Sequence, residues 1–469
     1  MARSLERYWP ENYRNKLHKK IHIISLGCPK NLIDSEVMAA ILERGGGRIV
    51  SSEGEADIVI INTCAFILPA KEESIEEIFR LIDLKERGGL EYLVVTGCLP
   101  QRYGAELEAE IPEVDLFLGT GEVPHIGDYL NKLEKRGGIS SHTFIGKPDF
   151  LMDASHSRLI STPPHTAYLK IAEGCSNCCS YCVIPMVRGS FRSREPDDIL
   201  KEVEVLAGGG VKEIILTAQE TTAYGKDLRE KPSLGPLMTD IARIGGIKWI
   251  RLLYTYPESI TEEILETILR EEKICNYIDI PVQHIDDEIL RMMRRRGDSA
   301  LIRTVIKRAR EIVPDVALRT SLIVGFPGET EEKFDRLIEF VRDTKFDHLG
   351  VFEYSREEGT GAAELPHQVP EEEKESRRRI IMEEQAEISH TINLSLIGSL
   401  EEVILEEASD HPDFDYIGRL QRQSPDIDGI TYVKAGGRKR GDIIRCRIDG
   451  ADDYDLFAEE VVEGEESLL

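Results

Sequence analysis

The chain has 469 residues, of which 41% are hydrophobic. This length exceeds that of a domain with a single hydrophobic core, so we expect two or three domains. Lys and Arg number 59 against 86 Asp and Glu, and the net charge of −27 makes nucleic acid an unfavoured substrate outside a local basic patch. No apolar run is long enough to span a bilayer, and residues 1–20 lack the apolar segment of a signal peptide. These absences predict a soluble cytoplasmic protein without a membrane partner, and in that compartment nine cysteines favour metal ligation over disulfides.

Three short apolar runs alternate with helical patterns in the first part of the chain. The runs are Ile21–Cys28, Asp57–Cys64 and Tyr92–Cys98, and helices are expected over Asp34–Arg44 and Ala70–Arg87. Continuously apolar strands separated by helices are typical of a parallel sheet that is buried on both faces. The sequence therefore predicts an N-terminal α/β domain.

Each of these predicted strands ends in a cysteine, namely Cys28, Cys64 and Cys98. The carboxyl ends of neighbouring parallel strands meet at one crevice, which is where ligands bind in such sheets. One buried cysteine at a strand end is commonly a small core residue. Three in register favour a site made of three thiolates.

A polar connector over residues 134–160, broken by Gly137-Gly138 and Lys147-Pro148, precedes a second series of strands. Six apolar runs with helices between them predict half to three-quarters of a βα-barrel, a partial (βα)6 arrangement like a TIM barrel. The runs cover residues 168–172, 213–218, 249–254, 277–282, 316–324 and 348–354.

Four of the nine cysteines fall within eight residues just after the first of these runs. Cys175, Cys179 and Cys182 have the spacing C-x-x-x-C-x-x-C, which lets one loop surround a single metal centre. A closed zinc site takes four ligands, whereas an iron–sulfur cluster on three thiolates keeps one iron open. Zinc with Cys178 as fourth ligand, or a disulfide, remain the alternatives; we expect Cys178 to be a bystander.

The spacing and its flanks resemble the cluster loop of radical S-adenosylmethionine enzymes. In that family a 4Fe-4S cluster binds S-adenosylmethionine at its open iron, and one electron cleaves the cofactor to a 5′-deoxyadenosyl radical. Three further motifs are similar to those of methylthiotransferases within this superfamily: Gly27-Cys28-Pro29-Lys30-Asn31, Asn62-Thr63-Cys64 and Thr96-Gly97-Cys98. The resemblance covers nearly the whole chain from Ile21. It implies a second 4Fe-4S cluster on Cys28, Cys64 and Cys98 that carries an exchangeable sulfur.

Polar and turn residues at the carboxyl ends of the predicted barrel strands are candidates to bind S-adenosylmethionine or the substrate. Ordinary helix caps and turns are the alternative for each of them. The predicted cofactor-binding residues are Gln219, Gln283, His284, Gly325 and Phe326, and further polar candidates are Glu220, Tyr256, Glu329, Tyr354 and Ser355. The turn that begins at Gly325 resembles the family's fifth-strand turn near the adenine.

The remaining segments have no predicted role in the chemistry. Arg291–Arg296 is typical of a solvated helix face, Glu371–Ile392 of a charged linking helix, and Cys275 and Cys446 of core residues. After Asn393, five short runs predict a small antiparallel β-barrel that resembles a TRAM domain. The runs cover residues 402–406, 414–420, 429–433, 442–448 and 456–461, and the predicted domains span residues 21–136, 160–392 and 393–465.

The resemblance leaves two branches of methylthiotransferases to distinguish, which differ in their substrate. The Gly-Cys-Pro-Lys-Asn form at Cys28 resembles the branch that modifies the β-carbon of an aspartate in protein twelve of the small ribosomal subunit. The alternative branch modifies an adenosine in transfer RNA, and a non-catalytic iron–sulfur or zinc protein that binds RNA is an alternative of another class. No motif identifies the sulfur donor or the electron donor.

Charge favours the ribosomal protein as substrate. Residues 394–469 contain eight Lys and Arg against 19 Asp and Glu, a net charge of −11, which suits a basic protein better than a polyanion. We expect four aspartates near the turns of this barrel to face a basic loop of the substrate: Asp413, Asp415, Asp426 and Asp428.

Overall fold

The structure is a computed structural model that describes residues 17–134 and 142–461. The predicted break at Gly137-Gly138 lies outside these residues. By its contacts the chain forms two compact units. Among the described residues, the N-terminal unit comprises residues 17–134, 142–161, 173–176 and 183–191, and the barrel unit comprises residues 162–172, 177–182 and 192–461. The bounds of the three predicted domains stay a prediction.

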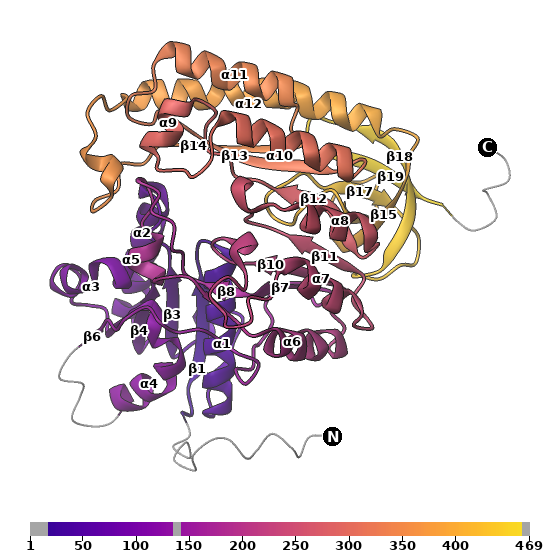
Figure 1. Cartoon of the computed structure of the whole chain (residues 1–469). Helices are drawn as coiled ribbons and strands as arrows, with labels where there is room; N and C mark the ends of the chain where they lie inside the picture. The colour runs from indigo at the N-terminus through magenta and orange to yellow at the C-terminus, as the bar shows by residue number, and fades with distance from the viewer. Residues whose placement is uncertain (1–16, 135–141, 462–469) are drawn as a thin grey trace. The chain divides into compact units, whose positions relative to one another are not determined.

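The N-terminal unit is built on a six-stranded parallel sheet in the order β2-β1-β3-β4-β5-β6, which confirms the predicted α/β class (Figure 1). Every residue of the central strand β3 is buried, as its uninterrupted apolar run requires. The strands are β1 (Lys20–Ser25), β2 (Arg48–Ile49), β3 (Ile58–Thr63), β4 (Tyr92–Gly97), β5 (Leu116–Leu118) and β6 (Thr143–Phe144). The helices are α1 (Pro29–Arg44), α2 (Leu68–Glu86), α3 (Cys98–Glu110), α4 (Ile126–Glu134) and the 3-10 turns η2 (Glu53–Glu55) and η3 (Thr120–His125).

Helix α1 begins earlier than its hydrophobic pattern indicates, and α3 is a helix that the sequence analysis did not predict. α1 starts at Pro29 rather than Asp34, because proline at the first helical position has a preset φ angle and lacks only an N–H that would be unpaired there. α3 starts at Cys98 directly after β4. Cys28 and Cys98 therefore stand at the N-termini of helices.

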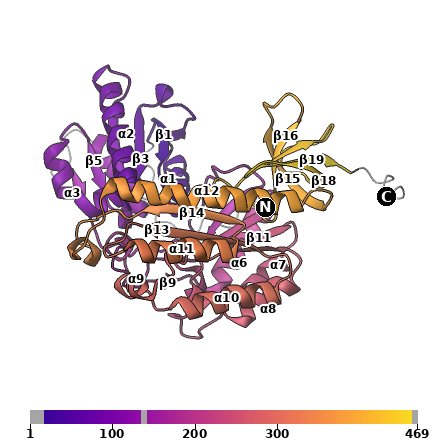
Figure 2. The same cartoon turned by 90° about the horizontal axis from the view of Figure 1, so that it is seen from above.

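The barrel unit contains a second six-stranded parallel sheet in the order β14-β13-β12-β11-β10-β7, which confirms the predicted partial barrel. Figure 2 shows helices around the outside of these strands. The strands are β7 (Thr166–Lys170), β10 (Glu213–Thr217), β11 (Trp249–Leu252), β12 (Ile274–Asp279), β13 (Ala317–Val324) and β14 (His348–Glu353), with the short strands β8 (Ala172–Glu173) and β9 (Arg192–Ser193) beside them in the chain. The helices are α6 (Pro196–Gly208), α7 (Leu234–Ala242), α8 (Glu262–Arg270), α9 (Asp287–Met292), α10 (Ser299–Ile312), α11 (Glu331–Thr344) and the turns η4 (Thr221–Ala223), η5 (Pro257–Ser259) and η6 (Gly361–Glu364).

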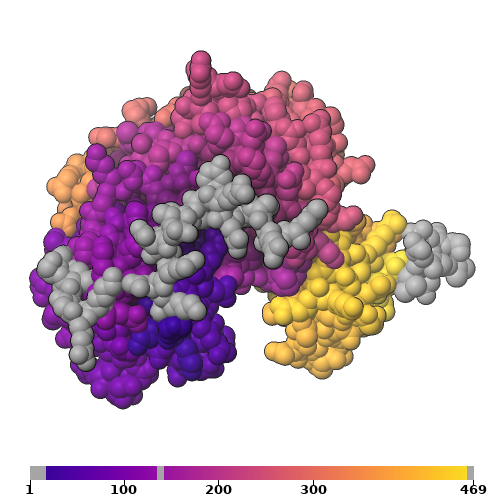
Figure 3. All heavy atoms as spheres, turned by 90° about the horizontal axis from the view of Figure 1, so that it is seen from below, coloured from indigo at the N-terminus to yellow at the C-terminus, as the bar shows by residue number. Residues whose placement is uncertain are grey.

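A long helix, α12 (Glu371–Ser395), packs along β14 and α11 and leads into a closed five-stranded barrel (Figure 2). The surface of this small barrel is yellow in Figure 3. Its strands are β15 (Leu400–Ala408), β16 (Tyr416–Leu420), β17 (Thr431–Lys434), β18 (Ile443–Ala451) and β19 (Leu456–Glu460). All pairs are antiparallel except β17 with β19, which are parallel; the chain passes through β18 between these two strands. Cys446 and Cys275 are buried core residues, as predicted.

No helix among residues 17–134 and 142–461 is both long and apolar enough to cross a membrane.

Candidate iron–sulfur sites

Three cysteines follow the carboxyl ends of neighbouring strands in the N-terminal unit. Cys28 is the N-cap of α1 after β1, Cys64 follows β3, and Cys98 opens α3 after β4. The strands β1, β3 and β4 are adjacent in the sheet. Cys64 and Cys98 are buried and Cys28 is half-buried. The sheet order thus brings together thiols that are far apart in sequence.

Two glycines permit this convergence. Gly27 has φ +88°, and a Cβ there would lie 2.8 Å from the Cβ of Cys64 and 3.1 Å from its Sγ. Gly97 has φ +101°, and its Cβ would lie 2.6 Å from the carbonyl oxygen of Thr63. Only glycine combines these backbone angles with so close an approach. Both glycines directly precede a cysteine of the group.

The asparagines of the same motifs fix the loops that carry the thiols. Asn31 is fully buried, and its Nδ2 donates to the carbonyl oxygens of Leu26 (3.0 Å) and Thr63 (2.9 Å). Asn62 donates to the carbonyl oxygen of Asn31 (2.8 Å) and to Ser35 Oγ (3.0 Å). These bonds tie the strand ends to α1, so the polar residues of the motifs are explained by local structure.

The thiols influence one another electrostatically, as groups in one crevice do. Burial, together with the charges of Cys98 and Cys28, raises the pKa of Cys64 to about 12. Burial also raises the pKa of Cys98. At Cys28 burial acts in the same direction, yet the charges of Lys30 and Arg188 and two backbone N–H groups at the start of α1 outweigh it, and the pKa of Cys28 is lowered.

This donor set fits an iron–sulfur cluster bound through three cysteines, because three thiols converge beside a buried cation, Arg188. Among the described residues, no group of three or more His, Cys, Asp or Glu side chains is arranged to hold a single metal ion.

Residues 177–182, the part of the cluster loop that carries Cys179 and Cys182, are anchored at several points within the barrel unit, whereas Cys175 belongs to the N-terminal unit, where its N–H donates to Gly189 O (3.0 Å). Ser180 donates through its N–H to Met293 O (3.0 Å) and through Oγ to Met292 O (2.7 Å), and its own carbonyl accepts from Ala362 N (2.7 Å). Asn177 donates to the carboxylate of Glu220, which follows β10. Cys182 N–H donates to Cys179 O (3.1 Å), which closes a turn between these two cysteines. These bonds attach residues 177–182 to the loops after β10, α9 and β14.

Tyr256 and Arg295 lie beside Cys179. The hydroxyl of Tyr256 is 3.0 Å from Cys179 Sγ, and the guanidinium of Arg295 lies 3.8 Å from the centre of the tyrosine ring. Arg295 Nη2 donates to Pro281 O (2.8 Å), but its Nη1 is buried without a partner, as is Oε1 of Glu258. A buried donor and a buried acceptor left unpaired are costly. They fit a zwitterionic ligand such as the amino-acid end of S-adenosylmethionine.

The predicted cofactor-binding residues occupy different surroundings. His284 is fully buried: its Nδ1 accepts from Asp286 N (2.9 Å) and its Nε2 lies 3.2 Å from Glu329 Oε1. Gly325 N–H donates to the same Glu329 carboxylate, so these two predicted residues share one network. Both ring nitrogens of His284 are thus engaged within the chain.

The other three predicted residues lie apart from that network. Phe326 is fully buried and packs edge-on against Tyr354, with ring centres 5.2 Å apart. Gln283 has φ +70°, and its N–H donates to Ser321 O (2.9 Å). Gln219 is half-buried at the end of β10. Their binding of a cofactor stays a prediction.

Two arginines near the thiols escaped the sequence analysis. The prediction of a solvated helix face over Arg291–Arg296 is wrong for Arg295, because α9 ends at Met292 and the next turn directs this guanidinium onto Tyr256. Arg188, in the short helix α5 (Ile184–Arg188), is buried in the N-terminal unit. Neither position carries a periodic or spacing signal that would have identified it.

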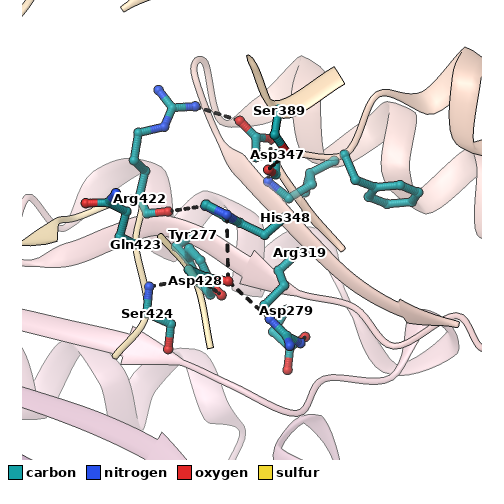
Figure 4. Close-up of polar contacts among 12 residues, drawn as sticks. Tyr277, Asp279, Arg319, Asp347, His348, Ser389, Arg422, Gln423, Ser424 and Asp428 are labelled. Carbon is teal, nitrogen blue, oxygen red and sulfur yellow. Dashed lines mark hydrogen bonds and ion pairs between the residues drawn. The ribbon is translucent and has the colours of Figure 1, made fainter. Parts of the chain in front are cut away.

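The expectation that Asp428 faces a substrate is also wrong. Figure 4 shows its carboxylate pointing into the joint between the small barrel and the strands β12 to β14. It accepts from Tyr277 Oη (2.8 Å) and Ser424 N (2.8 Å) and lies 3.4 Å from Arg319 Nε. Asp426 is exposed and accepts from Tyr168 Oη (3.4 Å). Desolvation explains the difference, since a fully buried carboxylate needs partners inside the chain.

Comparison with protein families matches three segments of the chain. Residues 20–119 match the family described as uncharacterized protein family UPF0004, residues 169–341 match the radical SAM superfamily, and residues 397–461 match the TRAM domain. The third match agrees with the domain expected from the five C-terminal strands.

Curated proteins match over almost the full length. A protein of Syntrophus aciditrophicus named ribosomal protein uS12 methylthiotransferase RimO is 61% identical over 94% of this chain and 98% of its own. A protein of the same name from Geobacter sulfurreducens is 52% identical over the same shares. Among solved structures, the radical S-adenosylmethionine methyltransferase TsrM from Kitasatospora setae is similar in fold, with a TM-score of 0.51, 14% identity and coverage of 71% of this chain and 72% of that one.

Proposed function

Because this chain belongs to the family of ribosomal protein uS12 methylthiotransferases named RimO, we propose that it is a radical S-adenosylmethionine enzyme that attaches a methylthio group to uS12. The acceptor is the β-carbon of an aspartate. The observation that carries this proposal is the 61% identity to a RimO protein over 94% of the chain.

Cys175, Cys179 and Cys182 hold the 4Fe-4S cluster that the radical SAM family implies. A cluster bound there would supply the reductive cleavage of S-adenosylmethionine, whose radical product can remove hydrogen from an unactivated carbon. The chain's own part is orientation. Arg295 Nη1 and Glu258 Oε1 are the buried groups that suit the carboxylate and amino ends of the cofactor. Tyr256 contacts both Cys179, through its hydroxyl, and the guanidinium of Arg295, through its ring.

Cys28, Cys64 and Cys98 hold a second 4Fe-4S cluster, which carries the sulfur that is transferred. The support is the convergence of three thiols at one edge of the sheet, with Gly27 and Gly97 allowing their approach. Cys64 and Cys98 are buried and Cys28 is half-buried, which limits the access of water to the sulfur-bearing site.

The substrate is a basic ribosomal protein and not a nucleic acid. The net charge of −11 over residues 394–469 favours a basic partner, and the transfer-RNA alternative is not favoured because the matched relatives are named for uS12. Since ribosomes assemble in the cytoplasm, we place the enzyme there.

Co-expression of the enzyme with uS12, in cells that lack their own methylthiotransferases, tests the proposal. Mass spectrometry of uS12 is expected to show a methylthio group on one aspartate, with bulk transfer RNA unmodified. The matched control is Cys179→Ala, which should leave uS12 unmodified. Methylthio-adenosine in RNA together with unmodified uS12 would overturn the proposal.

A further inference from the structure

Arg188 is a buried cation of the N-terminal unit whose charge acts on all three thiols. Its side chain is 4% exposed, and its guanidinium donates through Nη2 to Asn31 Oδ1 and through Nη1 to Asp34. Nη1 also lies 3.4 Å from Glu173 Oε2. These partners are all nearly or fully buried, so Arg188 sits in a closed polar cluster.

The same cluster reaches the cysteines through Asn31. Asn31 Oδ1, which accepts from Arg188, also accepts from Cys98 Sγ at 3.8 Å. The amide nitrogen of Asn31 simultaneously ties the ends of β1 and β3 together. A change at Arg188 therefore acts through Asn31 on the ends of β1 and β3, which precede Cys28 and Cys64, and on Cys98 while its thiol is protonated.

The positive charge of Arg188 gives it a second role, which is to compensate buried negative charge. With the three cysteines ionised, the buried anions here are three thiolates, Asp34 and Glu173, whereas the buried cations beside them are Arg188 and Lys30. Buried anions without compensation are strongly destabilising. A guanidinium stays charged at any working pH and presents donors in a fixed fork. It can thus bind Asn31 and Asp34 at once, which a lysine ammonium cannot do in the same geometry.

We propose that Arg188 is a positioning residue for the second cluster: it fixes Asn31, which ties together the loops that carry the cysteines, and it supplies buried positive charge beside the thiolates of Cys28, Cys64 and Cys98. This role rests on the proposed function in one respect, namely that these three cysteines carry a cluster. Net charge and hydrogen bonds near the sulfurs set the reduction potential of an iron–sulfur cluster. Loss of the guanidinium should therefore favour the oxidised, less negative form.

The test uses the full chain with Cys175, Cys179 and Cys182 changed to Ala, so that the only cluster left is the one on the N-terminal cysteines. In this background Arg188→Gln is expected to shift the midpoint potential to a more negative value and to lower the iron content, and Arg188→Lys to produce a smaller shift. Asp34→Asn removes a competing anion and should shift the potential in the opposite direction. The readouts are a redox titration followed by electron paramagnetic resonance, and iron and sulfide analysis.

Arg158→Gln is the matched control. Arg158 is also 4% exposed in the N-terminal unit, but it pairs with Glu36 (2.6 Å). Its loss should lower the melting temperature without moving the potential. An unchanged potential in Arg188→Gln, or equal shifts in Arg158→Gln, would overturn the role of Arg188. If Arg188→Gln fails to fold, an unchanged potential in Asp34→Asn and Arg188→Lys overturns it equally. A background protein without any iron would instead refute the second cluster itself, and this role with it.

Discussion

At the scale of single residues, Cys178 and Cys179 are neighbours in the chain with different surroundings. Cys178 is exposed, whereas Cys179 Sγ lies 3.0 Å from the hydroxyl of Tyr256. We expect Cys179→Ala to abolish formation of 5′-deoxyadenosine from S-adenosylmethionine, because a cluster with two thiolates is lost. Cys178→Ala should retain it. The 5′-deoxyadenosine formed when the reduced protein is mixed with S-adenosylmethionine is measured by chromatography. Loss of iron in Cys178→Ala would show that our choice of ligands is wrong.

Gly27 provides a test of how tightly the N-terminal thiols are placed. Gly27→Ala forces a left-handed backbone on alanine, which costs about 1–2 kcal/mol, and also places a Cβ 2.8 Å from the Cβ of Cys64. Gly88 has φ +77° and nothing within 4 Å of the added Cβ. Gly88→Ala therefore introduces the backbone strain without a steric clash. We expect both variants to lose stability in thermal unfolding. Iron should fall in Gly27→Ala only, and equal iron in both would contradict the close placement.

At the scale of elements, a buried ion-pair group joins the partial barrel to the small barrel. Glu213 on β10 binds Arg251 on β11 (2.9 Å) and Arg419 on β16 (2.6 Å). Burial alone would raise the pKa of Glu213, but the two guanidinium groups outweigh it and lower the pKa from 4.5 to about 2. The carboxylate therefore stabilises the folded chain above pH 4.5, and this stability is lost as the pH falls toward 2.

Glu213→Gln tests that dependence. A depression of this size corresponds to about 3 kcal/mol, so the variant should unfold at lower temperature near neutral pH. Its melting temperature should also fall less steeply than that of the wild type between about pH 5 and pH 3. Glu266→Gln, at an exposed position on α8, is the control and should follow the wild type. Parallel pH profiles for wild type and Glu213→Gln would contradict the assignment.

Asp428 is a second contact between the small barrel and the partial barrel, because it binds Tyr277 on β12 and lies beside Arg319 on β13. Asp428→Ala leaves the Tyr277 hydroxyl and Ser424 N–H without their acceptor, whereas Arg319 keeps its ion pair with Asp279 (3.0 Å), so the expected cost is that of unpaired buried donors, about 1–3 kcal/mol. We expect faster proteolysis near residues 395–400 and a lower melting temperature. Asp413→Ala removes an exposed aspartate of the same barrel and should change neither. A proteolysis rate like that of the wild type would show that Asp428 does not fix the barrel.

At the scale of the whole molecule, the charge of −27 predicts how the enzyme meets its substrate. Association with basic uS12 should weaken as salt rises, because salt screens exposed charges. Asp410 and Asp413 are exposed on the small barrel, and changing each to Lys should weaken binding about two- to fivefold. Asp335→Lys, on the exposed face of α11, is the control. Binding isotherms at several salt concentrations make the measurement, and salt-independent affinity would contradict an electrostatic encounter.

The sequence predicted those features that depend on local periodicity. Uninterrupted apolar runs located β3 and β4, and strand order alone then placed Cys64 beside Cys98. It failed where a polar residue's role depends on a distant partner. Asp428 resembles any loop aspartate until Arg319 and Tyr277 are known to face it. Arg295 and Arg188 resemble surface arginines for the same reason, since their sequence neighbours do not reveal which carboxylates or rings the fold brings to them.

The position of α5 has a consequence for the order in which the protein is made. Residues 183–191 belong to the N-terminal unit, although the first strand of the barrel, β7, precedes them in the chain. During synthesis, Cys28, Cys64 and Cys98 leave the ribosome long before Arg188 does. The crevice around them is therefore incomplete while the first 161 residues are the only ones exposed. Iron and sulfide delivered at that stage would meet thiols that lack their cation, so assembly of the second cluster belongs after the translation of β7 and α5.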